Sequence, residues 1–134
     1  MLDLVKTLCG GLLLGAVLIS PVWAAPDRLR VVDGDTLARG SVRLRVLNLD
    51  APDIGNHARC TLERKRGEEA RRYAVQLLRS ARSGAVVVTP SGRVDRYGRA
   101  LVWVSISGQD FAALMIAAGH GRPWRGRSSD WCGS

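Results

Sequence analysis

Residues 31–53 read VVDGDTLARGSVRLRVLNLDAPD, and the rest of the chain is best understood from this stretch. Acids stand at both of its ends, and the strand-like run between them holds two arginines among valine and leucine. The charged residues that matter here are Asp33, Asp35, Asp50, Asp53, Arg43 and Arg45. Burying an unpaired charge is costly, so we expect these arginines and acids to meet one another, a metal ion or an anionic ligand.

Three strands are expected in and around this stretch, over residues 28–33, 36–39 and 41–49. Turn residues at Asp33-Gly34 and Gly40 separate them, which predicts an antiparallel meander. Within residues 41–49, a period of two puts Val42, Leu44 and Val46 on one face and Arg43, Arg45, Leu47 and Leu49 on the other. Both faces carry apolar side chains, so the third strand is expected to be central.

The remainder of the chain predicts two helices and two further strands. Apolar residues at helical spacing indicate a helix over residues 61–82, with Thr61 as N-cap. Strands follow over residues 85–89 and 101–107, with a turn-rich loop over residues 91–98 between them. Asp110 is expected to cap a short helix over residues 111–118. The order β-β-β-α-β-β-α in a short basic chain predicts a β-barrel with helices, of the five-stranded Greek-key OB-fold type.

The first residues are typical of a signal peptide rather than of a folded segment. Residues 7–19 form an apolar run that follows Lys6 and precedes the small residues around Ala24, so residues 1–24 are predicted to be a cleaved leader. An uncleaved membrane anchor is the alternative, but spanning helices usually need about 20 apolar residues. We therefore expect an exported protein, periplasmic or secreted, with a domain over residues 25–120 and a Gly/Arg-rich tail over residues 121–134.

The charge balance of the chain is strongly basic. The 134 residues include 20 Lys and Arg against 12 Asp and Glu, a formal net charge of +8 that survives removal of the leader with Lys6 and Asp3. Arginine predominates, and its planar guanidinium suits bidentate recognition of phosphate, although a biased genome gives the same composition. Nucleic acid, anionic lipid and acidic glycans would all be attracted by this charge.

Two cysteines, Cys60 and Cys132, remain after the leader. Export would place them where disulfides persist, so we favour a bridge that ties the tail to the start of the long helix, over two free thiols in a reducing cell. Closing this loop would stabilise the fold by about 4 kcal/mol in the chain-entropy account.

Four separated motifs carry a resemblance to a known family. They are VVDGDT (31–36), RLRVLNLDAPD (43–53), GEEA (67–70) and DRYGRAL (95–101). In this order and at these separations they resemble the staphylococcal nuclease (thermonuclease) family, over about residues 28–119. The resemblance implies an OB-type fold and a calcium-dependent hydrolase that cleaves phosphodiester bonds of DNA and RNA with little sequence preference.

The resemblance also implies roles for particular residues. Asp35, Asp50 and the main-chain carbonyl of Ala51 match the Ca²⁺ ligands. Arg45 and Arg99 match the arginines at the scissile phosphate, and Asp53 stands where the family usually has the glutamate that activates water. Arg96 and Tyr97 match residues that bind a substrate phosphate. Oxygen ligands suit Ca²⁺, and positioned guanidiniums stabilise the charge that develops in phosphodiester hydrolysis.

Simpler interpretations stay open. Asp33-Gly34 is a common hairpin turn, and Arg45 could form a structural ion pair with a neighbouring acid. Because Asp53 is shorter than the glutamate usual in the family, the alternative is a catalytically weak or inactive module that binds nucleic acid. A structural or interaction domain of the cell envelope is a less favoured alternative. In every case we expect a monomer without a stable protein partner and without a membrane span in the mature chain.

Overall fold

The structure is a computed structural model that describes residues 28–133. The predicted signal peptide, residues 1–24, lies outside the described residues. No helix in the part that is described is both long and apolar enough to cross a membrane.

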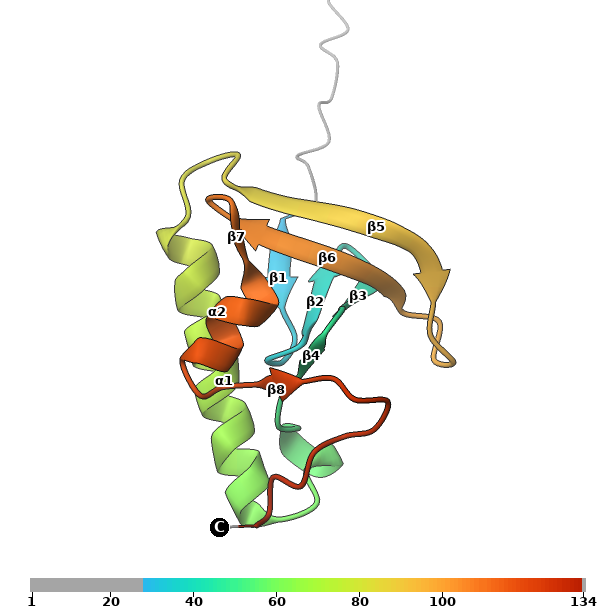
Figure 1. Cartoon of the computed structure of the whole chain (residues 1–134), viewed down its shortest axis with the longest axis vertical. Coiled ribbons are helices and arrows are strands. Elements are labelled where there is room, and N and C mark those ends of the chain that lie inside the picture. Colours follow the sequence, from blue (N-terminus) through green and yellow to red (C-terminus); the bar gives the residue numbers. More distant parts are fainter. Residues whose placement is uncertain (1–27, 134) are drawn as a thin grey trace, which may run out of the picture.

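A curled sheet forms the body of the protein (Figure 1). Its path is β1-β2-β3-β6-β5, and a short strand, β7, pairs with β6. The bounds are β1 Leu29–Val31, β2 Thr36–Arg39, β3 Val42–Val46, β5 Val86–Val94, β6 Ala100–Ile106 and β7 Gln109–Asp110. Neighbours along β1-β2-β3 are antiparallel, as the predicted meander requires, and the central β3 then pairs in parallel with β6. Within residues 28–133 no pairing joins β1 to β5, so the sheet is a half-barrel consistent with the OB-type fold.

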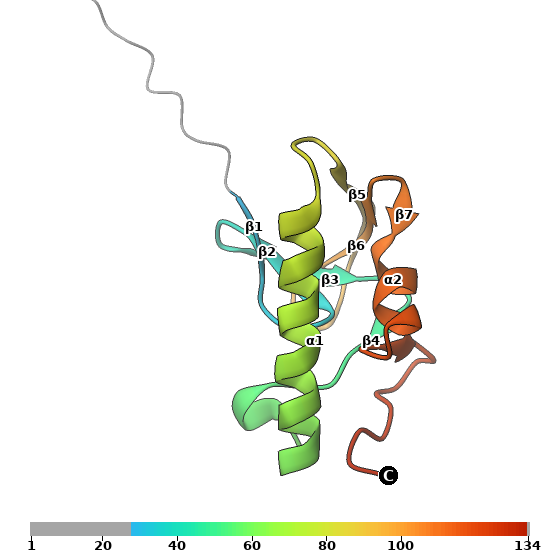
Figure 2. The same cartoon turned by 90° about the vertical axis from the view of Figure 1, so that its left-hand side faces the viewer.

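Two helices cover the sheet (Figure 2). Helix α1, Thr61–Ser80, buries a stripe that includes Gly67, Ala70 and Ala74. Helix α2, Phe111–Ala117, begins as predicted at Asp110, whose carboxylate accepts a hydrogen bond from Ala112 N. Between helices and sheet lies a core of mostly aliphatic side chains that includes the fully buried Phe111 and Met115. The predicted element order β-β-β-α-β-β-α is therefore confirmed for the longer elements, and the two-residue strands β4, β7 and β8 add to it.

Three predictions about α1 and β5 were wrong. The N-cap of α1 is Cys60, whose sulfur accepts a hydrogen bond from Glu63 N, and not Thr61. Strand β5 continues through Val94, so it takes in part of the loop predicted over residues 91–98. The long helix ends at Ser80, two residues earlier than expected, because Ala81 already has an extended backbone.

The strand predicted over residues 41–49 is divided in two. Asn48 has a left-handed backbone, with φ of 62°, which ends β3 and starts the short strand β4, Leu49–Asp50. Because this turn rotates the chain, Leu49 and Asp50 are both buried, and the predicted alternation does not extend to Leu49. An aspartate is thereby carried into the interior at the end of the strand.

The tail is more ordered than a segment without periodicity suggests. Strand β8, Arg122–Pro123, pairs antiparallel with β4, with Arg122 opposite Asp50. The remainder runs irregularly along the lower part of the molecule in Figure 1 to Cys132, which forms a disulfide with Cys60 just before α1. The tail is thus fastened to the domain at both ends.

Candidate active site

Asp35 lies at the centre of the site, in the turn between β1 and β2. The side chain of Asp33 shapes this turn by accepting a hydrogen bond from Asp35 N at 3.1 Å. The Asp35 carboxylate accepts hydrogen bonds from Ala51 N at 2.8 Å and from Thr36 Oγ1 at 3.1 Å. Asp35 therefore joins the β1–β2 turn to the segment that follows β4, and it is only 8% exposed.

Arg45 reaches the same carboxylate from the central strand β3. Its Nη2 lies 3.4 Å from Asp35 Oδ2, and its Nη1 donates to the carbonyl of Val46 at 2.6 Å. The ring of Trp124, from the tail, lies 5.5 Å from the guanidinium carbon. Arg45 does form the ion pair that the simpler interpretation anticipated, and the acid it pairs with is a predicted metal ligand.

Arg99 approaches from the turn between β5 and β6. Asp95 organises this turn: its carboxylate accepts hydrogen bonds from Tyr97 N, Arg99 N and, at 2.6 Å, Arg99 Nε. Burial alone would raise the pKa of Asp95, but these hydrogen bonds outweigh it and lower the pKa. Arg99 Nη1 then donates to Thr36 Oγ1 at 3.4 Å, so Thr36 connects Arg99 to Asp35. No pattern in the sequence singles out Thr36 or Asp95 for these roles.

Arg96 and Tyr97 lie at the exposed tip of the same turn. The Tyr97 ring is 68% exposed, with the guanidinium of Arg96 at 4.9 Å from its centroid and that of Arg99 at 5.4 Å. Cation–π contacts of this kind hold a guanidinium without using its hydrogen-bond donors. Arg96 therefore keeps its donors for an anion, whereas two groups of Arg99, Nε and Nη1, already donate to the protein.

Asp50 is held by the tail, in a way the sequence did not predict. Its Oδ2 accepts hydrogen bonds from Ser129 N at 2.7 Å and from Trp131 Nε1 at 3.2 Å, and the residue is 3% exposed. Nothing in the local pattern around Ser129 or Trp131 indicates these contacts. Asp50 directly precedes Ala51, whose N–H donates to Asp35, so the main chain next to Asp50 is joined to Asp35.

Asp53 lies where the loop passes over α1. Its N–H donates to Glu63 Oε1 at 3.3 Å, and burial, then the negative charges of Glu63 and Asp33, raise the pKa of its carboxyl group. A Cβ at Gly67 would lie 2.3 Å from the carbonyl oxygen of Asp53. Only glycine permits this approach, which gives the glycine of the GEEA motif a physical reason.

The electrostatics of Asp35 favour a cation. Burial raises its pKa to about 7, although the positive charge of Arg45 opposes this shift. Within residues 28–133 no group of three or more His, Cys, Asp and Glu side chains forms a metal cluster. The donors that the resemblance assigns to Ca²⁺, the carboxylates of Asp35 and Asp50 and the main-chain oxygen of Ala51, are hard oxygens of the kind that this ion prefers.

The fold and the site together define a nuclease-type domain, in which buried carboxylates and arginines meet on an OB-like sheet. The family described as "Staphylococcal nuclease homologue" matches residues 43–129. The chain therefore belongs to the staphylococcal nuclease homologue family, as its motifs predicted.

Relatives among curated proteins carry a nuclease name. Proteins called "Uncharacterized endonuclease" from Escherichia coli O157:H7 and from Escherichia coli are each 30% identical over 96 residues. The match covers 68% of this chain and 55% of each relative. The chain thus spans about half the length of these relatives.

Proposed function

We propose that this chain is an exported, calcium-dependent nuclease that hydrolyses phosphodiester bonds in DNA and RNA with little sequence preference. One observation carries the proposal: Asp35 pairs with Arg45 and is linked through Thr36 to Arg99. Two guanidiniums beside a buried carboxylate make an arrangement suited to a phosphate that shares its oxygens with a cation. Family membership and the name of the relatives support the same reaction class.

The metal would be held by Asp35, Asp50 and the main-chain carbonyl of Ala51. When bound, Ca²⁺ supplies positive charge that orients the substrate and polarises its phosphoryl group. Main-chain N–H groups already hold the carboxylates of both acids. Ala51 N, from the residue after Asp50, donates to Asp35, and Ser129 N donates to Asp50. Ionised carboxylates are costly to bury, so the cation would also stabilise the folded protein.

The arginines would act on the phosphate. Arg45 and Arg99 donate hydrogen bonds to its oxygens, and these bonds strengthen as negative charge develops in the transition state. Arg96 and Tyr97 would bind a neighbouring phosphate from the exposed turn. Trp124, 44% exposed and beside Arg45, offers a face on which a base can stack. All these contacts go to phosphate or to base faces, so they read no sequence.

Asp53 would accept the proton of the attacking water. A carboxylate whose pKa is raised is a stronger base near neutral pH than an ordinary aspartate. Its carboxylate is one methylene shorter than glutamate, so its reach depends on the loop. The close contact of this loop with Gly67 fixes where the main chain of Asp53 lies.

A second candidate is a module that binds nucleic acid without cleaving it. Two observations favour it: the ion pair between Arg45 and Asp35 occupies both groups, and Asp53 is the shorter acid. The two candidates differ in one measurable respect, which is turnover in calcium.

The test is to incubate the mature domain with single- and double-stranded DNA and with RNA, in calcium and then in chelator. We expect cleavage in calcium only. Arg99→Ala should slow cleavage by roughly 100- to 1000-fold, the usual cost of removing one donor to a developing negative charge. Arg93→Ala, an exposed arginine on β5, is the matched control and should cleave normally. Intact substrate in every cation would leave only the binding module.

Export is part of this proposal and has its own support. The disulfide between Cys60 and Cys132 suits an oxidising compartment. Expression of the whole chain in a bacterial host, followed by cell fractionation and mass determination, tests it. The expected mature protein begins after Ala24, outside the cytoplasm.

A further inference from the structure

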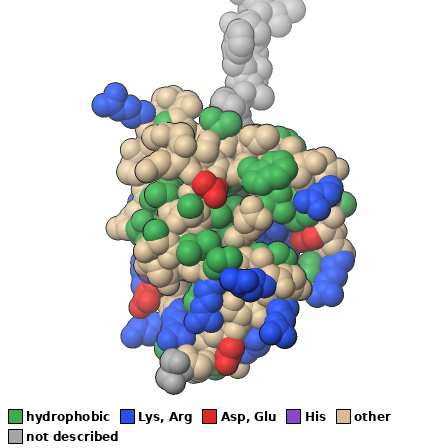
Figure 3. Space-filling view, in the orientation of Figure 1, with side chains coloured by type: hydrophobic (Ala, Val, Ile, Leu, Met, Phe, Trp, Pro, Cys, Tyr) green, Lys and Arg blue, Asp and Glu red, His purple; other side chains and the backbone are tan. Residues whose placement is uncertain are grey.

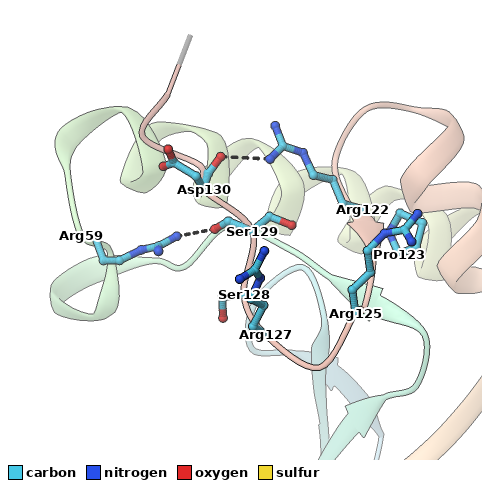
Figure 4. Close-up of a pocket in the computed structure, with 8 residues that line it drawn as sticks. All are labelled: Arg59, Arg122, Pro123, Arg125, Arg127, Ser128, Ser129 and Asp130. Atoms are coloured by element: carbon cyan, nitrogen blue, oxygen red, sulfur yellow. Dashed lines mark hydrogen bonds between the residues drawn. The ribbon is translucent and has the colours of Figure 1, made fainter.

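The tail forms a second basic feature, separate from Arg45 and Arg99. A hollow of about 650 Å³ is lined by four arginines, Arg59, Arg122, Arg125 and Arg127, together with Pro123, Ser128, Ser129 and Asp130. Figure 4 shows Arg59 on one side of the tail, Arg122 and Arg125 on the other, and Arg127 between them. In Figure 3, Lys and Arg side chains gather at the lower part of the visible face, where the tail runs in Figure 1. We call this feature the tail hollow.

The positive charge of the tail hollow is poorly balanced. Arg59 pairs with Glu63 at 3.2 Å, but no other arginine of the hollow forms an ion pair with an acid of residues 28–133. Asp130 is the acid of the lining, and its carboxylate is turned to the N–H groups of Cys132 and Gly133. Arg122 donates to the main-chain carbonyl of Asp130 instead, at 2.9 Å. Arg125 and Arg127 are exposed and keep their donors for an external group.

Several contacts fix the part of the tail that forms the hollow. Arg59 donates to the carbonyl of Ser129, and Arg66 donates to the carbonyl of Trp131 at 2.7 Å. The Arg122 guanidinium lies 4.2 Å from the centre of the Trp131 ring, and the disulfide fixes Cys132. Arg59 and Arg122 are thus placed before an anion arrives, so only the exposed Arg125 and Arg127 have to be ordered on binding.

The tail hollow also lies directly beside the candidate active site. Ser129 belongs to both: its carbonyl accepts from Arg59 in the hollow, and its N–H donates to Asp50. Arg122 stands opposite Asp50 in the β4–β8 pair. A polynucleotide strand bound at Asp35 and Asp50 would therefore pass close to the hollow.

We propose that the tail hollow binds a backbone phosphate of the nucleic acid, one or more nucleotides away from the bond that is cut. The proposal rests on the proposed function for the identity of the strand, and it adds a contact supplied by the tail. Guanidiniums bind phosphate oxygens in pairs of parallel hydrogen bonds, and such contacts hold a strand in register without reading its bases. The hollow has room for a nucleotide, and it is open to a chain that enters and leaves.

The test measures binding apart from cleavage. A fluorescein-labelled single-stranded oligodeoxynucleotide is titrated with the disulfide-bonded mature protein in chelator, at several salt concentrations, and anisotropy gives the dissociation constant. Arg125→Gln with Arg127→Gln should weaken binding and reduce the slope of log affinity against log salt by about 0.7 for each phosphate that the variant no longer neutralises. The matched control, Arg72→Gln with Arg82→Gln, removes the same charge from positions on and just after α1 and should leave the slope unchanged.

Each outcome bears on the proposal. An unchanged slope in the tail variant, an equal fall in the control, or no binding by the wild-type protein overturns it. So does a tail variant that loses affinity for vesicles of anionic lipid but keeps its affinity for the oligonucleotide. Cleavage by the wild-type protein in calcium is measured separately. If the tail variant has a reduced slope but the wild-type protein does not cleave, the phosphate site stands and the nuclease proposal fails. If the slope is unchanged and the wild-type protein cleaves, only the phosphate site fails.

Discussion

The indole nitrogen of Trp131 donates a hydrogen bond to Oδ2 of Asp50 at 3.2 Å, across 81 residues of sequence. Ser129 N donates to the same oxygen at 2.7 Å. The tail therefore fixes the orientation of a candidate metal ligand that lies at the end of a two-residue strand. Partners that orient a ligand in this way commonly change metal affinity when they are removed.

Replacing Trp131 by phenylalanine tests this relationship. Trp131→Phe keeps a ring beneath Arg122 but removes the N–H, so the affinity for calcium should fall roughly tenfold or more. Isothermal titration with calcium measures it. Trp103→Phe, at an exposed position on β6, is the control and should bind calcium normally. Equal affinity in both variants would mean that Ser129 N–H alone positions Asp50, or that Asp50 is not a ligand.

Removal of the disulfide should lower stability and loosen the tail. Cys60 and Cys132 are 72 residues apart, and opening a loop of this length is expected to cost about 4 kcal/mol of unfolding free energy. Urea denaturation of the Cys60→Ser, Cys132→Ser double variant measures the difference. The oxidised wild-type protein gives the reference, and a difference below about 1 kcal/mol would show that other contacts already hold the tail.

Gly67→Ala should destabilise the protein, although alanine normally favours a helix by about 1 kcal/mol over glycine. The new Cβ would lie 2.3 Å from the carbonyl oxygen of Asp53 and 2.9 Å from that of Pro52. Main-chain atoms cannot move aside as side chains do, so α1 or the Asp53 loop must shift, at a cost of about 1–3 kcal/mol in unfolding free energy. Because the shift displaces Asp53, cleavage should also slow. Thermal unfolding and the rate of cleavage are measured together. Lys65→Ala, exposed on the same helix, should be neutral in both, and a neutral Gly67→Ala would contradict the close packing.

Asp53→Glu should preserve or raise the rate of cleavage. The added methylene extends the carboxylate toward the position of the water, and a misplacement of about 1 Å can change a rate on the order of a hundredfold. Initial rates in saturating calcium measure the effect, with Asp53→Asn as the variant that removes the base and should be slow. A clear loss of activity in Asp53→Glu would show that the loop has adapted to the shorter acid.

The lowered pKa of Glu63 predicts how the free energy of unfolding depends on pH. Burial by itself would raise its pKa, but hydrogen bonds from Arg59 N, Arg59 Nε and Asp53 N outweigh burial and lower the pKa below 4.5. A lowered folded-state pKa means that Glu63 stabilises the protein above its unfolded value of 4.5 and loses this contribution as the pH falls through the folded value.

Urea midpoints from neutral pH downward, for wild type and Glu63→Gln, measure this dependence. The difference between the two proteins should be largest at neutral pH and shrink below 4.5. Acids that do not interact with Glu63 titrate alike in both proteins and cancel in this comparison, whereas the pKa of Asp53, which Glu63 raises, should fall in Glu63→Gln. A difference that stays constant with pH would show that the hydrogen bonds to Glu63 do not depend on its charge.

Much of the fold could be predicted from local pattern. The alternation over residues 43–46, the apolar stripe of α1 and the cap at Asp110 are short-range features, and each forms where it was expected, whereas Val42 is exposed and departs from the alternation. The boundary errors have local causes of a kind that pattern does not show, namely the left-handed Asn48 and the sulfur cap at Cys60. Asparagine is one of the few residues besides glycine that adopt a left-handed backbone, but most asparagines do not, and cysteine is not among the preferred N-caps, so tertiary packing decides both roles.

Like the fold, the candidate site could be predicted from the sequence only in part. The sequence by itself determined which residues are acids and arginines, their order along the chain, and the family to which they belong. Only the tertiary structure decided three contacts of the site. Thr36 links Arg99 to Asp35, and Gly67 packs against the loop of Asp53. Trp131, in the tail, donates a hydrogen bond to Asp50. The physical reason is distance along the chain: hydrogen bonds across 63 or 81 residues leave no periodic trace in the sequence and exist only once the sheet has curled and the tail has closed on β4.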